Sequence, residues 1–283
     1  MQQAVQQSQS AKSFADLGYT IIPRAADDAL LTLIERDIAD VFHRRARAAG
    51  LDLALPSNYD ELSKLIIALK QHDQNAYLQA AKAANHLASL AQLGVSPKVM
   101  SLVRELGLVT PTIATRTVLL FMANSLAIEG GYLKTPPHQD FRSVQGSLNS
   151  IVLWTPLADV GSDDYPVVVA DGSHRLGLLP SSEHVFGHQI EPACLEGLSF
   201  RSVTLKRGDI LVFSTLLVHA TSETGGERVR IAASFRFNDA ADSSYLDRGL
   251  PIPYIYKADM ALRTPNFPTP ADMDAVFGRR ANK

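Results

Sequence analysis

Three residues of the chain have the types and the spacing of an iron site: His138, Asp140 and His219. His138 and Asp140 stand two positions apart, so a strand through them would place both side chains on the same face of a sheet. His219 lies far along the chain and would have to come from another strand that the fold brings alongside. Two histidines and one carboxylate on one face bind Fe(II) and leave positions open for a chelating cosubstrate and O2. We therefore expect these three residues to be the metal ligands and the catalytic residues.

A second candidate group is a pair of arginines in a β-rich run after His219. A guanidinium can pair with a carboxylate through two parallel hydrogen bonds, which makes Arg230 a candidate for binding a cosubstrate carboxylate. Arg228 is an alternative, because the two residues stand two apart on one expected strand and would face the same way. Periodicity does not choose between them. Arg236, further along the run, is expected to be structural or to face the solvent.

Composition is that of an ordinary globular protein: 283 residues, 46% hydrophobic and 20% charged. A net charge of −2 offers no electrostatic attraction to nucleic acid or an anionic membrane, and no apolar run approaches the ~20 residues of a membrane helix. Cys194 is the single cysteine, which excludes an intramolecular disulfide and fits a reducing, cytoplasmic compartment. Residues 1–10 are Gln- and Ser-rich, lack the apolar core of a signal peptide and are expected to form a flexible tail. Residues 11–283 are expected to form one domain.

The first part of this domain, about 27–106, is predicted to be a helical elaboration. Apolar residues at helical spacing predict helices over 27–49, with Asp27 or Asp28 as the cap, and over about 59–70, 74–92 and 96–106. Ahead of them, a short helix is expected to end at Gly18 and to be followed by a strand over residues 19–22. Residues 50–110 could include a lid over the active site.

From about residue 111 the sequence changes to Thr-, Val- and Ile-rich runs of strand length, separated by Gly, Asp and Pro. We expect strands near 112–126, 150–156, 166–170, 200–206, 210–214 and 228–238. Short repeated strands after a helical half indicate a closed or two-sheet β core over about 111–238, with helices packed outside it. The Pro-rich segment 239–283 is expected to wrap this core as an ordered loop.

Further motifs accompany the candidate ligands in a fixed order along the chain. They are Phe14-Ala15-Asp16-Leu17-Gly18-Tyr19, Pro137-His138-Gln139-Asp140, Leu153-Trp154-Thr155-Pro156-Leu157, Asp171-Gly172-Ser173-His174-Arg175, Gly208-Asp209-Ile210 and Val218-His219-Ala220-Thr221-Ser222. With Arg230, they resemble the phytanoyl-CoA dioxygenase superfamily of Fe(II)- and 2-oxoglutarate-dependent oxygenases over nearly the whole chain. Two positions depart from the family: Asp163-Asp164-Tyr165-Pro166 replaces a Gly-rich segment, and Ala220 replaces a glycine.

The resemblance implies an α+β fold with a double-stranded β-helix (jelly-roll, cupin-like) core and flanking N-terminal helices. It implies Fe(II), the cosubstrate 2-oxoglutarate and O2, with the iron held by the three residues named above. Arg230 would bind the far carboxylate of 2-oxoglutarate, and the Thr221 hydroxyl would help to hold it. The family's spacing favours Arg230 over Arg228, and it assigns His174 to a structural turn.

The expected activity is hydroxylation or another oxidation of a small organic metabolite or natural-product intermediate, with succinate and CO2 as coproducts. Asp140 favours oxygenation over chlorination, since related halogenases lack this carboxylate. Arg142 and Gln145 follow the metal motif and are candidates for binding substrate, although Arg142 could equally be solvated or structural.

Two alternatives stay open. One is a cupin-like metal enzyme that does not use 2-oxoglutarate and so has no need of Arg230. The other is a non-catalytic binding protein on the same fold, against which the complete His-Asp-His-Arg set argues. A small-molecule substrate is expected in each enzyme reading, with no nucleic acid and no membrane as partner. The oligomeric state is not predicted.

Overall fold

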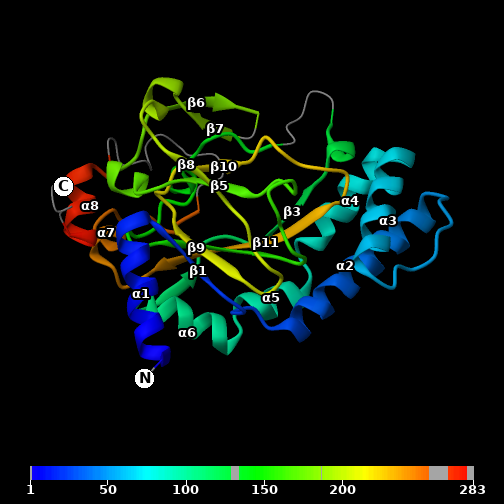
Figure 1. Ribbon diagram of the computed structural model, residues 1–283, viewed down its shortest axis with the longest axis horizontal. Coiled ribbons are helices and arrows are strands. Elements are labelled where there is room, and N and C mark those ends of the chain that lie inside the picture. Colours follow the sequence, from blue (N-terminus) through cyan, green and yellow to red (C-terminus); the bar gives the residue numbers. More distant parts are fainter. Residues whose placement is uncertain (1, 129–133, 186, 255–266, 279–283) are drawn as a thin grey trace.

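Two facing antiparallel sheets form the centre of the molecule (Figure 1). This computed structural model describes residues 2–128, 134–185, 187–254 and 267–278. The larger sheet has six strands in the order β1-β9-β4-β11-β2, and β3 also pairs with β11. Its strands are β1 (Tyr19–Ile22), β9 (Ile210–Ser214), β4 (Ile151–Pro156), β11 (Arg230–Asp239), β2 (Pro111–Ile113) and β3 (Val118–Met122).

The smaller sheet carries the second candidate histidine. Its order is β10-β5-β8, with β10 (His219–Thr221), β5 (Val167–Ala170) and β8 (Phe200–Val203). Apolar side chains from both sheets pack between them, including Trp154 and Phe213 from the large sheet and Val169 from the small one. The fold is therefore the predicted α+β fold, a jelly-roll core with N-terminal helices outside it.

A two-stranded hairpin, β6 (Ser181–His184) and β7 (Gly187–Ile190), lies beyond the small sheet in Figure 1. The sequence did not predict it, because its residues are mostly polar and so lack the apolar alternation of a half-buried strand. Residue 186, in its turn, lies outside the described residues.

Helices cover the outer face of the large sheet (Figure 1). They are α2 (Asp28–Ala48), α3 (Tyr59–His72), α4 (Gln74–Ala84), α5 (Ala88–Gly94) and α6 (Pro97–Glu105). The predicted cap of the first of them is confirmed: the Asp27 carboxylate accepts a hydrogen bond from the Ala29 backbone N–H at 2.9 Å. Residues 50–110 were considered for a lid over the active site. The helices in this region instead pack on the outer face of the large sheet, on the side away from the small sheet.

Alternate residues of β11 point to opposite faces of the large sheet. Ile231, Ala233, Phe235 and Phe237 belong to the apolar cluster shared with the helices, whereas Ala232 belongs to the cluster between the two sheets. Even-numbered residues of this strand therefore face the inside of the jelly roll. This alternation decides where the arginines of the strand point.

The N-terminal segment differs from its prediction. Residues 2–10, predicted as a flexible tail, form the first turns of α1 (Gln2–Leu17). The run contains neither glycine nor proline and is rich in glutamine, which favours helix. The helix ends at Gly18, as predicted, with φ at +83°. A Cβ on Gly18 would lie only 2.4 Å from the His174 ring, so the position also requires glycine for space.

Two predicted elements are each divided in the structure. The helix expected over 74–92 breaks between α4 and α5 at Asn85, whose side chain donates to the Ala81 carbonyl and accepts from the Leu119 N–H. The strand expected over 112–126 breaks between β2 and β3. The C-terminal segment, expected to be loop throughout, contains α7 (Ser243–Leu246) and α8 (Pro270–Phe277). Its residues 255–266 and 279–283 lie outside the described part.

The helix α8 begins at a capping signal within the segment that was expected to be loop. Thr269 and Asp272 form a reciprocal capping box, and Pro270 occupies the first turn. The ring of Phe277, at the other end of α8, lies 6.2 Å from that of Phe14 in α1, so the two terminal helices pack together (Figure 1). Within the described residues, no helix has the length and apolar character needed to cross a bilayer.

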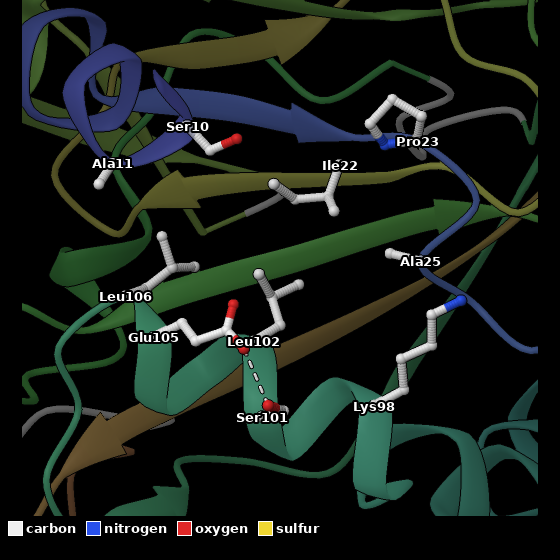
Figure 2. A pocket seen from close by; sticks show the side chains of 10 residues that line it. All are labelled: Ser10, Ala11, Ile22, Pro23, Ala25, Lys98, Ser101, Leu102, Glu105 and Leu106. Atoms are coloured by element: carbon white, nitrogen blue, oxygen red, sulfur yellow. Dashed lines mark hydrogen bonds between the residues drawn. The ribbon is translucent and has the colours of Figure 1, made fainter. Parts of the chain in front are cut away.

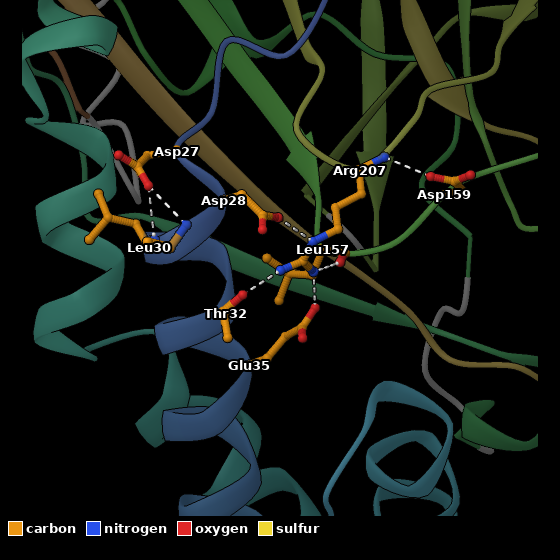
Figure 3. A network of polar contacts seen from close by, with 9 residues as sticks. Asp27, Asp28, Leu30, Thr32, Glu35, Leu157, Asp159 and Arg207 are labelled. Atoms are coloured by element: carbon orange, nitrogen blue, oxygen red, sulfur yellow. Dashed lines mark hydrogen bonds and ion pairs between the residues drawn. The ribbon is translucent and has the colours of Figure 1, made fainter.

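Arg207 joins the jelly roll to the helical layer (Figure 3). It lies in the turn between β8 and β9, where Gly208 has the positive φ of a tight turn. Its guanidinium donates to Asp28 at 2.8 Å and to Thr32 at 3.1 Å, both on α2. It also contacts the Glu35 carboxylate and the Leu157 carbonyl oxygen. One half-buried side chain thus connects a turn of the barrel to the first turns of α2.

Replacement of Arg207 by alanine is expected to lower the free energy of unfolding by about 1.5–3 kcal/mol, the range for losing hydrogen bonds to charged groups. Urea denaturation at neutral pH measures the change. Lys206→Ala is the matched control, because the ion pair of Lys206 with Asp159 is largely exposed, at 78% and 57% of the side-chain surface. Equal losses in the two variants would show that the network in Figure 3 is not what stabilises this junction.

Candidate metal centre

Backbone pairing brings the two candidate histidines together. His138 and His219 exchange both backbone hydrogen bonds, at 3.0 and 3.1 Å, in an isolated antiparallel bridge. Their ring centroids lie 4.1 Å apart. The segment before Asp140 therefore extends the small sheet next to β10, and both imidazoles are buried between the sheets.

Each imidazole is oriented by a backbone carbonyl. Nδ1 of His138 lies 2.8 Å from the Pro136 carbonyl oxygen, and Nδ1 of His219 lies 3.0 Å from that of Leu217. A carbonyl only accepts, so the proton is assigned to Nδ1 and Nε2 keeps its lone pair for a metal. Burial, and then the neighbouring His219, lowers the pKa of His138 to about 3, and burial lowers the pKa of His219 as well. Both rings are thus neutral at pH 7, the state that metal binding requires.

Asp140 reaches the site by a different route from the one predicted. It does not continue a strand from His138: the chain turns there into a short 3₁₀ helix over Asp140–Arg142. The strand prediction fails because Phe141 donates its N–H to the Thr215 carbonyl, at 2.8 Å, and the chain bends to make this bond. Oδ1 of Asp140 nonetheless lies 3.7 Å from Nε2 of His138.

Arg236 pairs with Asp140 through two hydrogen bonds, a contact that the sequence did not reveal. Its Nε donates to Oδ2 at 3.0 Å and its Nη2 donates to Oδ1 at 3.2 Å. Burial by itself would raise the pKa of Asp140, but the charge of Arg236, helped by the two histidines, lowers it to about 2. Arg236 is therefore not solvent-facing: its side chain is 17% exposed and its charge is directed at the candidate ligand.

The residue between the two ligands fixes the segment in place. The buried side-chain amide of Gln139 donates to the carbonyls of Gly177 and Leu216, at 2.8 and 2.6 Å, and its oxygen accepts from the Leu179 N–H at 2.8 Å. Three hydrogen bonds to two separate loops hold the backbone that carries His138 and Asp140. Such anchoring holds the two candidate ligands in fixed positions.

The three predicted ligands form one compact donor set. One ligand atom from each of His138, Asp140 and His219 lies within 4.8 Å of the others, and all three residues are buried. Two neutral imidazoles and one ionised carboxylate match the donor set of non-haem Fe(II). By donor chemistry and by geometry, the residues present fit such an ion.

Arg230 lies on the inner face of β11, buried at 5% exposure. It donates from Nη1 to the Tyr165 carbonyl, and its guanidinium carbon lies 5.2 Å from the centre of the Trp154 ring. Among the described residues, its Nε has no hydrogen-bond partner, and neither has the buried indole Nε1 of Trp154. Burial lowers the pKa of Arg230 to about 10, so it stays cationic at neutral pH. No acidic partner pairs with it among the described residues.

Arg228 has a different environment. It precedes β11 instead of lying on it, pairs with Asp60 at 3.2 Å and lies over the Tyr59 ring. Both partners belong to α3. The two arginines, which periodicity placed on one face, differ because the strand begins between them: Arg230 points into the jelly roll and Arg228 points towards the helical layer.

Tyr165 stands at the position where the resemblance leads one to expect a Gly-rich segment. Its φ of +52° is in the left-handed region that favours glycine. Its ring packs so closely on Gly225 that a Cβ there would lie 2.1 Å from ring carbons. This conformation aims the Tyr165 carbonyl at Arg230, a role that composition and spacing do not signal.

The remaining predicted site residues, Thr221, Arg142 and Gln145, make their contacts away from the three candidate ligands. Thr221 is half-buried and its hydroxyl accepts from the Thr135 N–H at 3.3 Å. Arg142 donates to the Leu179 carbonyl at 2.6 Å. Gln145 is 3% exposed, and its backbone carbonyl accepts from Arg248. None of these contacts reaches the three candidate ligands.

A cavity elsewhere contains none of the predicted residues. It has a volume of about 290 Å³ and lies between α1, β1 and α6 (Figure 2). Its lining is mainly apolar, with Pro23 and Leu102 among the lining residues and Lys98 and Glu105 at its polar side. It carries no donor set comparable to the one between the sheets.

Comparisons with known proteins bear on the family and the fold of the chain. The model of the phytanoyl-CoA dioxygenase (PhyH) family matches residues 14–232. No match was found among curated proteins.

Several solved structures share the fold. The epimerase SnoN of nogalamycin biosynthesis, in complex with Fe3+, alpha ketoglutarate and nogalamycin RO, has a TM-score of 0.58 at 17% identity, over 84% of this chain and 85% of that chain. EctD from S. alaskensis, with 2-oxoglutarate and 5-hydroxyectoine, has a TM-score of 0.56 at 14% identity, over 83% and 77%. The non-heme monooxygenase ThoJ has a TM-score of 0.53 at 18% identity, over 81% and 76%.

Proposed function

Since the chain belongs to the phytanoyl-CoA dioxygenase family, we propose that it is an Fe(II)- and 2-oxoglutarate-dependent oxygenase acting on a small organic molecule. The observation that carries the proposal is the pairing of a buried His-Asp-His donor set with a buried arginine that has no anionic partner in the described structure. A metal ion would bind the donor set, and a dicarboxylate bound to that metal would supply the anion that pairs with the arginine.

The iron would be held by His138, Asp140 and His219. When bound, Fe(II) with 2-oxoglutarate and O2 supplies the oxidant for an unactivated C–H bond, and the cosubstrate leaves as succinate and CO2. The role of the protein is to keep the imidazoles neutral, to keep the carboxylate ionised and to exclude water. The pKa directions of all three residues favour this state at neutral pH.

The far carboxylate of 2-oxoglutarate would bind Arg230. A buried guanidinium without a counter-ion is costly, so an anion that enters the site gains a charge-assisted hydrogen bond and relieves that cost. The unpartnered Nε1 of Trp154 offers a second donor next to it. Thr221 is on β10, two residues beyond His219, from where its hydroxyl would contribute to the same carboxylate site.

The reaction would be an oxidation and not a chlorination. Asp140 is an anionic ligand of its own, so chloride has no ligand position to take over. The neighbours named above include an epimerase and a monooxygenase, which leaves both hydroxylation and other oxidative outcomes within the proposal. Arg142 and Gln145, which follow the metal motif along the chain, are proposed substrate contacts.

In an anaerobic titration, Fe(II) and 2-oxoglutarate together are expected to give the chain a visible charge-transfer absorption that neither gives alone. A substrate screen scored by succinate then identifies a turnover condition. The assay is run in a buffer that contains chloride. The expected product gains one oxygen atom that derives from O2, and succinate is formed in an equal amount.

Other results would point to the alternatives. Turnover that needs iron but not 2-oxoglutarate would assign the chain to another cupin-like metal enzyme class. A chain that binds neither metal nor cosubstrate would be a binding protein on the same fold, and a chlorinated product would contradict the role proposed for Asp140.

A further inference from the structure

We propose that Arg236 is a positioning residue that restricts Asp140 to binding the metal through a single oxygen, and so keeps coordination positions open. The inference rests on the proposed function, because it concerns the same donor set. The inference goes beyond the proposed function because it assigns a role to Arg236. In the contacts described above, this side chain touches neither Arg230 nor the two histidines.

The geometry of the pair carries the argument. Nε and Nη2 of Arg236 each take a different oxygen of Asp140, at 3.0 and 3.2 Å. The Asp140 side chain is 4% exposed and that of Arg236 is 17% exposed, so water does not compete effectively for these bonds. Two parallel hydrogen bonds fix the rotation of the carboxylate as well as its position.

The fork occupies the side of the carboxylate that a chelated metal would need. An ionised carboxylate has about four lone-pair sites, two on each oxygen. A metal that binds both oxygens must sit between them, and in Asp140 the guanidinium already occupies that place. The outward-facing lone pairs remain. Oδ1 lies 3.7 Å from Nε2 of His138, so we assign this oxygen to the metal.

The number of protein ligand atoms decides what else the ion can hold. With one oxygen from Asp140 and two imidazoles, an octahedral Fe(II) keeps three positions, enough for a chelating cosubstrate and one further small ligand. A chelating Asp140 would occupy a fourth position and leave no place for that further ligand. Arg236 therefore keeps the third open coordination position of the iron free.

The pairing of β11 with its neighbouring strands fixes the backbone position of Arg236. Arg236 pairs in register with Val152 of β4, and its backbone carbonyl accepts from the Ala114 N–H at 2.9 Å. It shares the inner face of β11 with Arg230, at the other end of the strand. One strand thus carries two inward cations, one directed at a metal ligand and one without an anionic partner among the described residues.

The test compares Arg236→Lys and Arg236→Ala with the wild-type chain, each loaded anaerobically with Fe(II) and saturating 2-oxoglutarate. Nitric oxide is the probe of the third position, and its binding is followed by electron paramagnetic resonance. Both variants are expected to bind Fe(II) one to one, and to bind nitric oxide more weakly by on the order of 10-fold or more, comparable to a lost charge-assisted contact. X-ray absorption should show an added oxygen from Asp140 in both.

The lysine variant separates geometry from charge. Lysine keeps the positive charge but lacks the two-point fork, so wild-type nitric oxide binding in Arg236→Lys would overturn the proposal in favour of simple charge neutralisation. Loss of Fe(II) binding by a folded Arg236→Lys would also overturn it, because the proposal concerns the number of bound oxygens. Arg228→Lys, whose contacts are with α3, is the matched control and should behave as wild type.

The wild-type chain tests the premise independently. If it fails to bind Fe(II) and 2-oxoglutarate, the proposed function itself fails, and the assignment of Arg236 fails with it. If it binds both and the two variants match it, only the assignment of Arg236 is wrong.

Discussion

His138→Ala, Asp140→Ala and His219→Ala are each expected to abolish turnover while leaving the chain folded. Each residue supplies one of three ligand atoms in the donor set, so a variant has too few donors to retain Fe(II). Loss of a partner that merely orients a ligand typically costs 10- to 100-fold in metal affinity, so loss of the ligand should cost at least on the order of 100-fold. Iron content after gel filtration and succinate formation measure the two effects.

The matched control is His86→Ala. His86 is an exposed histidine in the turn between α4 and α5, far from the donor set in sequence and behind the large sheet. This variant should keep its iron and its activity, and circular dichroism should give the same helix content for all four variants. Full activity with a normal iron content in any one of the three ligand variants would remove that residue from the site.

Arg230→Ala is expected to raise the apparent KM for 2-oxoglutarate by on the order of 10- to 100-fold, which corresponds to the loss of a charge-assisted hydrogen bond of about 1.5–3 kcal/mol. Iron content should be unchanged, because Arg230 contacts Tyr165 and Trp154 and none of the three ligands. Steady-state kinetics at saturating substrate and varied 2-oxoglutarate measure the change.

Arg228→Ala serves as the control for this prediction. It removes an arginine two positions away whose ion pair with Asp60 is exposed at 42% and 73%, so KM for 2-oxoglutarate should change little. The opposite pattern, with Arg228→Ala raising KM and Arg230→Ala leaving it unchanged, would transfer the role to Arg228.

The candidate ligands could be named from the sequence because their types and order are local signals. His138 and Asp140 are two residues apart, and a β-rich run surrounds His219. A closed or two-sheet β core could be predicted for a similar reason, since strand-length apolar runs recur from residue 111 onwards, and the family resemblance implied that this core is a jelly roll. The pair of His138 and Asp140 and the strand-length runs need only near neighbours in the chain, whereas His219 was linked to them by the order of motifs along the chain.

The rest depended on contacts between distant segments. Arg236 was expected to be structural or solvent-facing, because nothing near it in sequence reveals that it will meet Asp140, a residue in another part of the chain. The bend at Asp140 depends likewise on the Thr215 carbonyl. The choice between Arg230 and Arg228 needed the first residue of β11, and strand boundaries are the least certain part of a sequence-based prediction.

The alternation along β11 also bears on how reliably the chain folds. A shift of one residue in the pairing of a strand turns every side chain to the opposite face. In β11 a misregistered strand would drive Arg230 and Arg236 into the apolar layer beneath the helices and turn Phe235 and Phe237 towards the candidate metal ligands. Two unpaired charges in an apolar layer carry a large desolvation penalty. The two inward-facing arginines therefore also disfavour the wrong strand register during folding. A chain with the wrong register would be destabilised, and would not persist as a stable but inactive protein.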